Sequence, residues 1–233
     1  MIKTLLPART RGMAAAAMLV ATALGLASCT AEPVPTLPQA YTGLPASIDP
    51  QCRDGTATIY DECGDQVALF REALARANAE NKVLLVEYGA EWCIWCHVFN
   101  AYINGDKGRF RYTYASAKEP EAWATKTFEE DDDVAGAEEL RDFVARHFVV
   151  VRIDYQYAPN GAEVLEVSRA KEHFSGGLPF VFTVDSHGHY AATFEGRGLE
   201  KRRGSFNWYR GFHRDTMLRV LTSMRNAALA ARH

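Results

Sequence analysis

A pair of cysteines at Cys-x-x-Cys spacing, Cys93 and Cys96, is the feature that most constrains how this chain can fold. The pair follows directly on an apolar run at residues 83–88, which is typical of a buried strand. This order predicts that Cys93 stands where a helix begins, where backbone N–H groups and the helix dipole favour a thiolate. The pattern therefore predicts a dithiol that can open and close a disulfide. A static disulfide or half of a zinc site is the alternative, although the sequence has no second Cys-x-x-Cys to complete a zinc site.

The N-terminal residues 1–28 have the pattern of a secretory signal peptide. Basic residues at positions 3, 9 and 11 precede an Ala-rich apolar stretch that is too short to span a membrane. The stretch ends in Leu-Ala-Ser-Cys at residues 26–29, which resembles the bacterial lipobox. We therefore expect Cys29 to be lipidated and to begin the mature chain. A plain signal peptide with a free Cys29 is the alternative.

The charge of the chain argues against nucleic-acid binding. The formal net charge is −3, and it becomes −6 when the three basic residues of the signal peptide are removed. A small basic loop at residues 197–203 is expected to be solvated, and no concentrated basic face is evident.

The expected location of the protein is the bacterial cell envelope, which it would reach by export and to which the lipid on Cys29 would anchor it. Thr30 stands in place of the Asp associated with inner-membrane retention, which favours the outer membrane if the source is Gram-negative.

Two further cysteines, Cys52 and Cys63, flank a short polar loop and could form a structural disulfide, which would persist outside the cytosol. Two unpaired thiols and a second redox pair are the alternatives. The prolines of residues 29–50 predict an extended tether, and residues 51–64 form an N-terminal extension with the two cysteines. The folded domain is predicted at residues 65–233.

The domain is interrupted by an insertion at about residues 101–133, interpreted as part loop and part helix, with an acidic, solvated end. The other segments alternate between helical and strand patterns. In chain order they are a helix after the N-cap candidate Asp65, the strand at 83–88, the dithiol helix, a helix leading into a strand at 148–153, a helix at roughly 162–174, a hairpin of strands 180–184 and 189–194, and a closing helix.

This order of elements resembles the thioredoxin fold over roughly residues 65–231. The resemblance implies an α/β domain with a central mixed β-sheet flanked by helices, with the insertion after the Cys-x-x-Cys helix. The chain is similar to the C-terminal domain of the thiol:disulfide interchange protein and to other thioredoxin-like domains with a Trp-Cys-x-x-Cys core.

The resemblance also implies roles for residues around the dithiol. Cys93 would be the nucleophile that forms a mixed disulfide with a substrate, and Cys96 would resolve it. Glu87, six residues before Cys93, matches a strand acid that is buried in thioredoxins and relays a proton, with Glu in place of Asp. Pro179 matches the family's cis proline, and the backbone of Leu178 would pair with a substrate strand.

Trp92 and Trp95 are expected to line the approach to the dithiol, and a protonated His97 could stabilise a thiolate. His97 also completes a Cys-x-x-Cys-His motif, that of c-type haem attachment, in which it would be an axial ligand. We rank haem well below redox chemistry, because the motif follows a buried strand and only the thioredoxin resemblance accounts for Pro179. The pair formed by His187 and His189 is interpreted as part of a turn.

The function predicted is that of a membrane-tethered thiol:disulfide oxidoreductase that needs no cofactor and acts on exported protein substrates. A reductase that draws electrons from a membrane donor protein is favoured over an oxidase. The alternative from another class is a partner-binding module that uses the groove at Leu178 and Pro179, with an incidental dithiol.

Overall fold

The computed structural model describes residues 43–107, 109–115, 123–129, 134–196, 198–201 and 211–231; for 109–115, 123–129 and 134 it describes the backbone only. The described residues all belong to one compact unit of the chain, Leu37–His233. The predicted signal peptide, Cys29, most of the tether, and parts of the acidic run and of the basic loop lie outside the described residues. No helix among the described residues is long and apolar enough to cross a membrane.

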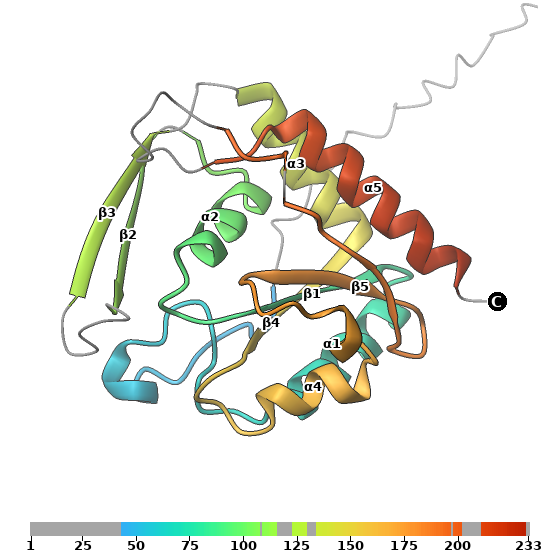
Figure 1. Ribbon diagram of the computed structural model, residues 1–233, viewed down its shortest axis with the longest axis horizontal. Helices are drawn as coiled ribbons and strands as arrows, with labels where there is room; N and C mark the ends of the chain where they lie inside the picture. The colour runs from blue at the N-terminus through green and yellow to red at the C-terminus, as the bar shows by residue number, and fades with distance from the viewer. Residues whose placement is uncertain are drawn as a thin grey trace, which may run out of the picture. The chain divides into compact units, whose positions relative to one another are not determined.

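The core of this unit is a mixed sheet of four strands in the order β4-β1-β5-β6 (Figure 1). The central strand β1 (Val83–Gly89) pairs in parallel with β4 (Phe148–Asp154) and antiparallel with β5 (Phe180–Val184). Strand β6 (Tyr190–Thr193) returns antiparallel beside β5. Every residue of β1 and β4 is buried, as expected for strands covered on both faces.

Helices cover both faces of this sheet (Figure 1). Side chains at alternate positions of a strand point to opposite faces. Leu84 and Val86 pack with α1 (Gln66–Ala79) and α4 (Gly161–Val167). Val83 and Leu85 pack on the other side, in a cluster that includes residues of the three remaining helices, namely α2 (Ile94–Ile103), α3 (Val134–His147) and α5 (Arg214–Ala230). The predicted fold class, a thioredoxin-like α/β domain, is confirmed.

The insertion differs from its prediction. Instead of loop and helix it contains an antiparallel pair of strands, β2 (Arg109–Ala115) and β3 (Trp123–Glu129), which form a sheet of their own. The physical reason can be read in the sequence of β2, Arg-Phe-Arg-Tyr-Thr-Tyr-Ala, where aromatic and polar residues alternate with the period of a strand.

The helix predicted at 162–174 is shorter than expected, because α4 ends at Val167. Arg169 adopts a left-handed conformation with φ 56°. The N–H of Ala170 then donates to the carbonyl of Leu165 (2.9 Å), which satisfies a carbonyl at the end of the helix. A short 3₁₀ turn, Lys171–His173, follows.

The folded unit begins earlier than residue 50, the expected end of the tether. Leu44 is buried and forms a parallel bridge with Val151 on the outer edge of β4. Its N–H donates to the carbonyl of Val150 (2.8 Å), and its carbonyl accepts from the N–H of Arg152 (2.9 Å). The bridge therefore covers part of the edge of β4, the outer strand of the sheet.

Candidate active site

The dithiol lies where β1 gives way to α2, as its position in the sequence predicts. Cys93 is the N-cap of α2, with φ −79° and ψ 105°, and its Sγ accepts a hydrogen bond from the N–H of Cys96 (3.2 Å). The two sulfurs are joined in a disulfide, with 5.2 Å between the Cα atoms. Cys93 is 4% exposed and Cys96 is 0% exposed, so Cys93 is the sulfur nearer to solvent.

An open cavity of about 360 Å³ lies beside Cys93, and most of its lining is apolar. Its lining residues come from the start of α2, from the segment after β4 and from the segment before β5: Trp92, Cys93, Ile94, Trp95, Tyr155, Phe174, Gly176 and Leu178. The peptide bond between Leu178 and Pro179 is cis. The cavity thus brings the predicted nucleophile together with both tryptophans and with Leu178.

Glu87 lies in the middle of β1 and is 0% exposed. The hydroxyl of Tyr60 donates to its Oε1 (3.0 Å), and Nε of Arg152, its partner residue on β4, lies 3.8 Å from its Oε2. Oε2 has no hydrogen-bond partner among the described residues. Burial raises the pKa of Glu87 to about 7, against the opposing effects of Arg152 and the Tyr60 hydrogen bond. The carboxyl can therefore take up or release a proton near neutral pH.

Tyr60 stands between this acid and the dithiol. It is 0% exposed and packs in one cluster with Ala90, Cys93 and Cys96. Gly89 lies two residues after Glu87 and so faces the same side of β1. A Cβ on Gly89 would come within 2.3 Å of the Tyr60 hydroxyl and 2.7 Å of Sγ of Cys96. Hydroxyl and sulfur are therefore neighbours across the space that Gly89 leaves open.

Glu91 fixes the segment that carries Tyr60. Its carboxylate accepts from the N–H groups of Ile59 (3.0 Å) and Tyr60 (3.1 Å) and from the hydroxyl of Thr58. On the other side, Nε2 of His97 lies 2.6 Å from the carbonyl oxygen of Glu91 and 3.8 Å from its Oε1. Glu91 therefore joins the start of α2 to the segment before α1. The tuning of a Cys93 thiolate by His97 stays a prediction.

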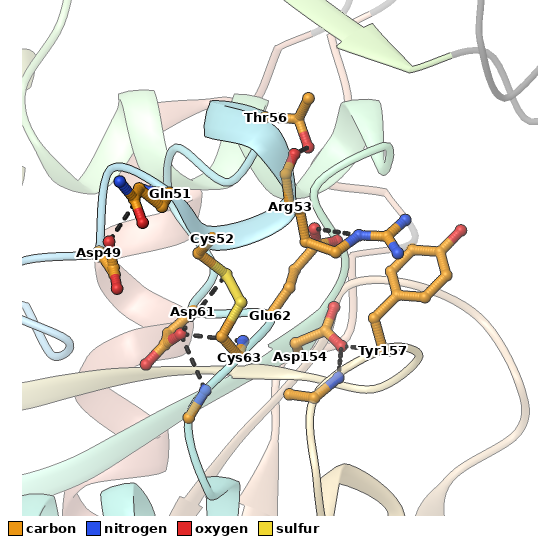
Figure 2. The surroundings of a disulfide bond; sticks show 12 residues. Asp49, Gln51, Cys52, Arg53, Thr56, Asp61, Glu62, Cys63, Asp154 and Tyr157 are labelled. Atoms are coloured by element: carbon orange, nitrogen blue, oxygen red, sulfur yellow. Dashed lines mark hydrogen bonds and ion pairs between the residues drawn. A yellow bond between two sulfur atoms is a disulfide. The ribbon is translucent and has the colours of Figure 1, made fainter.

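Cys52 and Cys63 form a disulfide, with 5.9 Å between the Cα atoms (Figure 2). The bond closes the loop that contains Tyr60. The carboxylate of Asp61 accepts from the N–H groups of Cys63 (3.0 Å) and Gly64 (3.0 Å) beside the bond. We call residues 52–63 the disulfide loop. A structural Cys52–Cys63 disulfide is one of the options that the sequence leaves open, and the structure has this bond.

A buried acid lies at the end of the disulfide loop as well. Glu62 pairs with Arg53 (3.4 Å), whose guanidinium also lies over the ring of Tyr157, 3.8 Å from the ring centroid (Figure 2). Burial, assisted by the nearby Asp154 and opposed by Arg53, raises the pKa of Glu62 to about 7.

Sequence reasoning identified the dithiol, Glu87 and three residues that line the cavity, but it missed Tyr155 and Phe174, which also line it, as well as Tyr60 and Glu91. Glu91 had a signal, because it lies two residues before Cys93 in the same motif. Tyr60 had none beyond its place between Cys52 and Cys63, since its contact with Glu87 spans 27 residues of chain. His187 and His189 lie at a turn, where the carboxylate of Asp185 accepts from the N–H groups of both.

The sheet order and a dithiol at the first turn of α2 define a thioredoxin-like fold with a Cys-x-x-Cys site. Comparison with family models and with curated proteins gives no match. Among solved structures, the chain is similar to a disulphide isomerase from Xylella fastidiosa Temecula1, with 24% identity, a TM-score of 0.36, and coverage of 59% of this chain and 79% of that one. It is also similar to the oxidised C-terminal domain of Neisseria meningitidis DsbD, with 17% identity, a TM-score of 0.34, and coverage of 70% and 97%.

Proposed function

We propose that this protein is a thiol:disulfide oxidoreductase whose reacting group is the Cys93–Cys96 pair. One observation carries the proposal: the pair is a closed disulfide at the N-terminus of α2, and its more exposed sulfur opens on an apolar cavity. An apolar groove beside a reactive sulfur suits an extended protein segment with a disulfide or a pair of thiols of its own.

The chemistry follows from the two positions of sulfur. The N–H of Cys96 donates to Sγ of Cys93, and α2 begins at that point, so a Cys93 thiolate is stabilised by both the hydrogen bond and the helix dipole. This thiolate attacks a substrate disulfide and releases one substrate thiolate. Cys96 then attacks Sγ of Cys93, which releases the second substrate thiolate and restores the Cys93–Cys96 disulfide.

Variants of the two cysteines test this proposal. Cys93→Ser is expected to abolish reduction of an unfolded disulfide-bonded protein, while Cys96→Ser is expected to accumulate a mixed disulfide that a gel shift detects. Full activity in Cys93→Ser would contradict the proposal. If a variant with both cysteines changed to Ser keeps binding and function, the chain is a partner-binding module instead.

We favour a reductase over an oxidase, on the resemblance of the sequence alone. The reduction potential of the pair, measured against defined thiol buffers, decides the direction. A value near the roughly −270 mV of thioredoxin indicates a reductase that needs a membrane donor of electrons, and a value near the roughly −120 mV of DsbA indicates an oxidase.

We also propose that the protein is exported and tethered to the cell envelope by a lipid on Cys29, which lies outside the described residues. The lipobox-like sequence at residues 26–29 supports this. Cys29→Ser is expected to move the chain from the membrane fraction to the soluble fraction.

The haem alternative gains nothing from the geometry of His97. Its Nε2 lies 2.6 Å from the Glu91 carbonyl, so the buried ring is already engaged within the turn before α2. Both cysteines that would carry thioethers are joined to each other.

A further inference from the structure

We propose that Tyr60, supplied by the disulfide loop, relays the proton between Cys96 and Glu87 when Cys96 resolves a mixed disulfide. The inference rests on the proposed function, because it concerns the second step of that reaction. It assigns a proton-transfer role to a residue outside the predicted domain at 65–233.

The need for a relay comes from burial. Cys96 is 0% exposed, so water does not reach its thiol directly, yet the thiol must lose a proton before it can attack Cys93. Glu87 is the buried base on the same face of β1. However, Cys96 packs beside Gly89, which lies two residues further along the strand, so Glu87 is not its immediate neighbour. A group that both accepts and donates a proton is required between them.

The Tyr60 hydroxyl is such a group. It donates to Oε1 of Glu87 at 3.0 Å, which leaves its oxygen lone pairs free to accept from a thiol. The same hydroxyl and Sγ of Cys96 both lie within 2.7 Å of the point where a Gly89 Cβ would stand. The phenol thus contacts the acid and neighbours the sulfur, and Glu87, Tyr60 and Cys96 are all fully buried.

The step balances without an outside reagent. The thiol proton of Cys96 passes to the Tyr60 oxygen while the Tyr60 hydroxyl proton passes to the Glu87 carboxylate, so Tyr60 ends unchanged. The Cys96 thiolate then attacks Sγ of Cys93, the bond from Cys93 to the substrate breaks, and the substrate leaves as a thiolate. Glu87 holds the proton until it is released.

The charged groups around Tyr60 suit a phenol that stays protonated overall. Glu87 from β1, Glu91 from the turn before α2 and Arg152 from β4 are the ionisable groups that act on it. Burial, followed by the charge of Glu87, raises the pKa of Tyr60 well above its ordinary value. Glu91 also fixes the backbone of Tyr60, so the hydroxyl is held in place from two sides.

The test separates the two steps in one experiment. The full chain, carrying Cys29→Ser and reduced at the Cys93–Cys96 pair alone, is mixed with dithiobis-nitrobenzoate. The first nitrothiobenzoate released reports attack by Cys93, and the second reports resolution by Cys96. In Tyr60→Phe we expect an unchanged first phase and a second phase slowed by about tenfold or more near neutral pH.

Two further readouts distinguish proton transfer from packing. The deficit of Tyr60→Phe should fade at pH values well above the ordinary thiol pKa of about 8.5, because hydroxide that enters when the site opens locally then removes the proton. Glu87→Gln should slow the second phase as Tyr60→Phe does, and the double variant should be no slower than Glu87→Gln alone. Tyr88→Phe, a buried tyrosine whose cluster lies on the other face of β1, is the matched control.

Each other outcome overturns the relay. It falls if the second phase of Tyr60→Phe equals that of the unchanged chain, if the first phase slows equally, or if the effects of the two variants multiply. Failure of the proposed function looks different, because the unchanged chain itself would then release no second nitrothiobenzoate.

Discussion

Gly89 shows how a single residue without a side chain shapes the site. Its place on β1 faces the buried dithiol, and the space that a methyl group would fill is taken by the Tyr60 hydroxyl and by Sγ of Cys96. Any larger residue must push one of them away. The position therefore links the stability of the domain to the geometry of the site.

We expect Gly89→Ala to lower the free energy of unfolding by about 1–3 kcal/mol, since the new Cβ would lie 2.3 Å from the hydroxyl and 2.7 Å from the sulfur. It should also slow resolution by Cys96, because the Tyr60 hydroxyl is displaced. Urea unfolding followed by circular dichroism measures the first effect. Gly177→Ala is the control, because a Cβ there meets nothing within 4 Å among the described residues. Equal stability of the two variants would contradict the packing described for Gly89.

At the scale of elements, the disulfide loop acts as a separate piece that is fastened to the site at two places. Its ends are closed by the Cys52–Cys63 bond, and its middle is held by Glu91 and Glu87. The loop is thus a part of the active site that precedes the first helix of the domain.

We expect replacement of Cys52 and Cys63 by Ser to lower the free energy of unfolding by about 2–3 kcal/mol, because the unfolded chain regains the freedom of the loop. Resolution by Cys96 should slow as well, since the Tyr60 hydroxyl is held less firmly. Thermal unfolding and the two-phase nitrothiobenzoate assay measure these effects. Resolution at the unchanged rate in this variant would show that the contacts with Glu91 and Glu87 suffice to hold Tyr60.

The elements also show what the sequence could and could not predict. Apolar runs placed β1, β4 and β5 correctly, because each strand is buried along its whole length, and the Cys-x-x-Cys motif placed the start of α2. The prediction for the insertion is wrong because its two strands pair only with each other, outside the main sheet that the other strand signals describe. The Tyr60 contact was beyond reach for another reason. It depends on the path of an irregular loop, which no local pattern specifies.

At the scale of the whole molecule, buried acids determine how stability varies with pH. The pKa values of Glu87 and Glu62 are both raised to about 7 by burial, from an ordinary value of 4.5. Between these values the folded state binds more protons than the unfolded state. Their contribution to stability is therefore complete below about pH 4.5 and is lost as the pH rises through about 7.

We accordingly expect Glu87→Gln and Glu62→Gln each to flatten the fall in stability between about pH 4.5 and 7, by an amount on the order of 1–3 kcal/mol per group. Urea unfolding across this range measures the effect. Glu72→Gln, at an exposed position on α1, is the control. A fall as steep in Glu87→Gln as in the unchanged chain would show that Glu87 is ionised in the folded protein.

The two disulfides join cysteines that are consecutive in the chain, the pair at 52 and 63 and then the pair at 93 and 96. A chain delivered N-terminus first presents both members of the earlier pair before either member of the later one. The loop can therefore close while no competing thiol of the reactive dithiol is yet present. In a chain that is exported N-terminus first, as proposed, the order of the cysteines would therefore separate formation of the structural bond from the chemistry of the reactive pair.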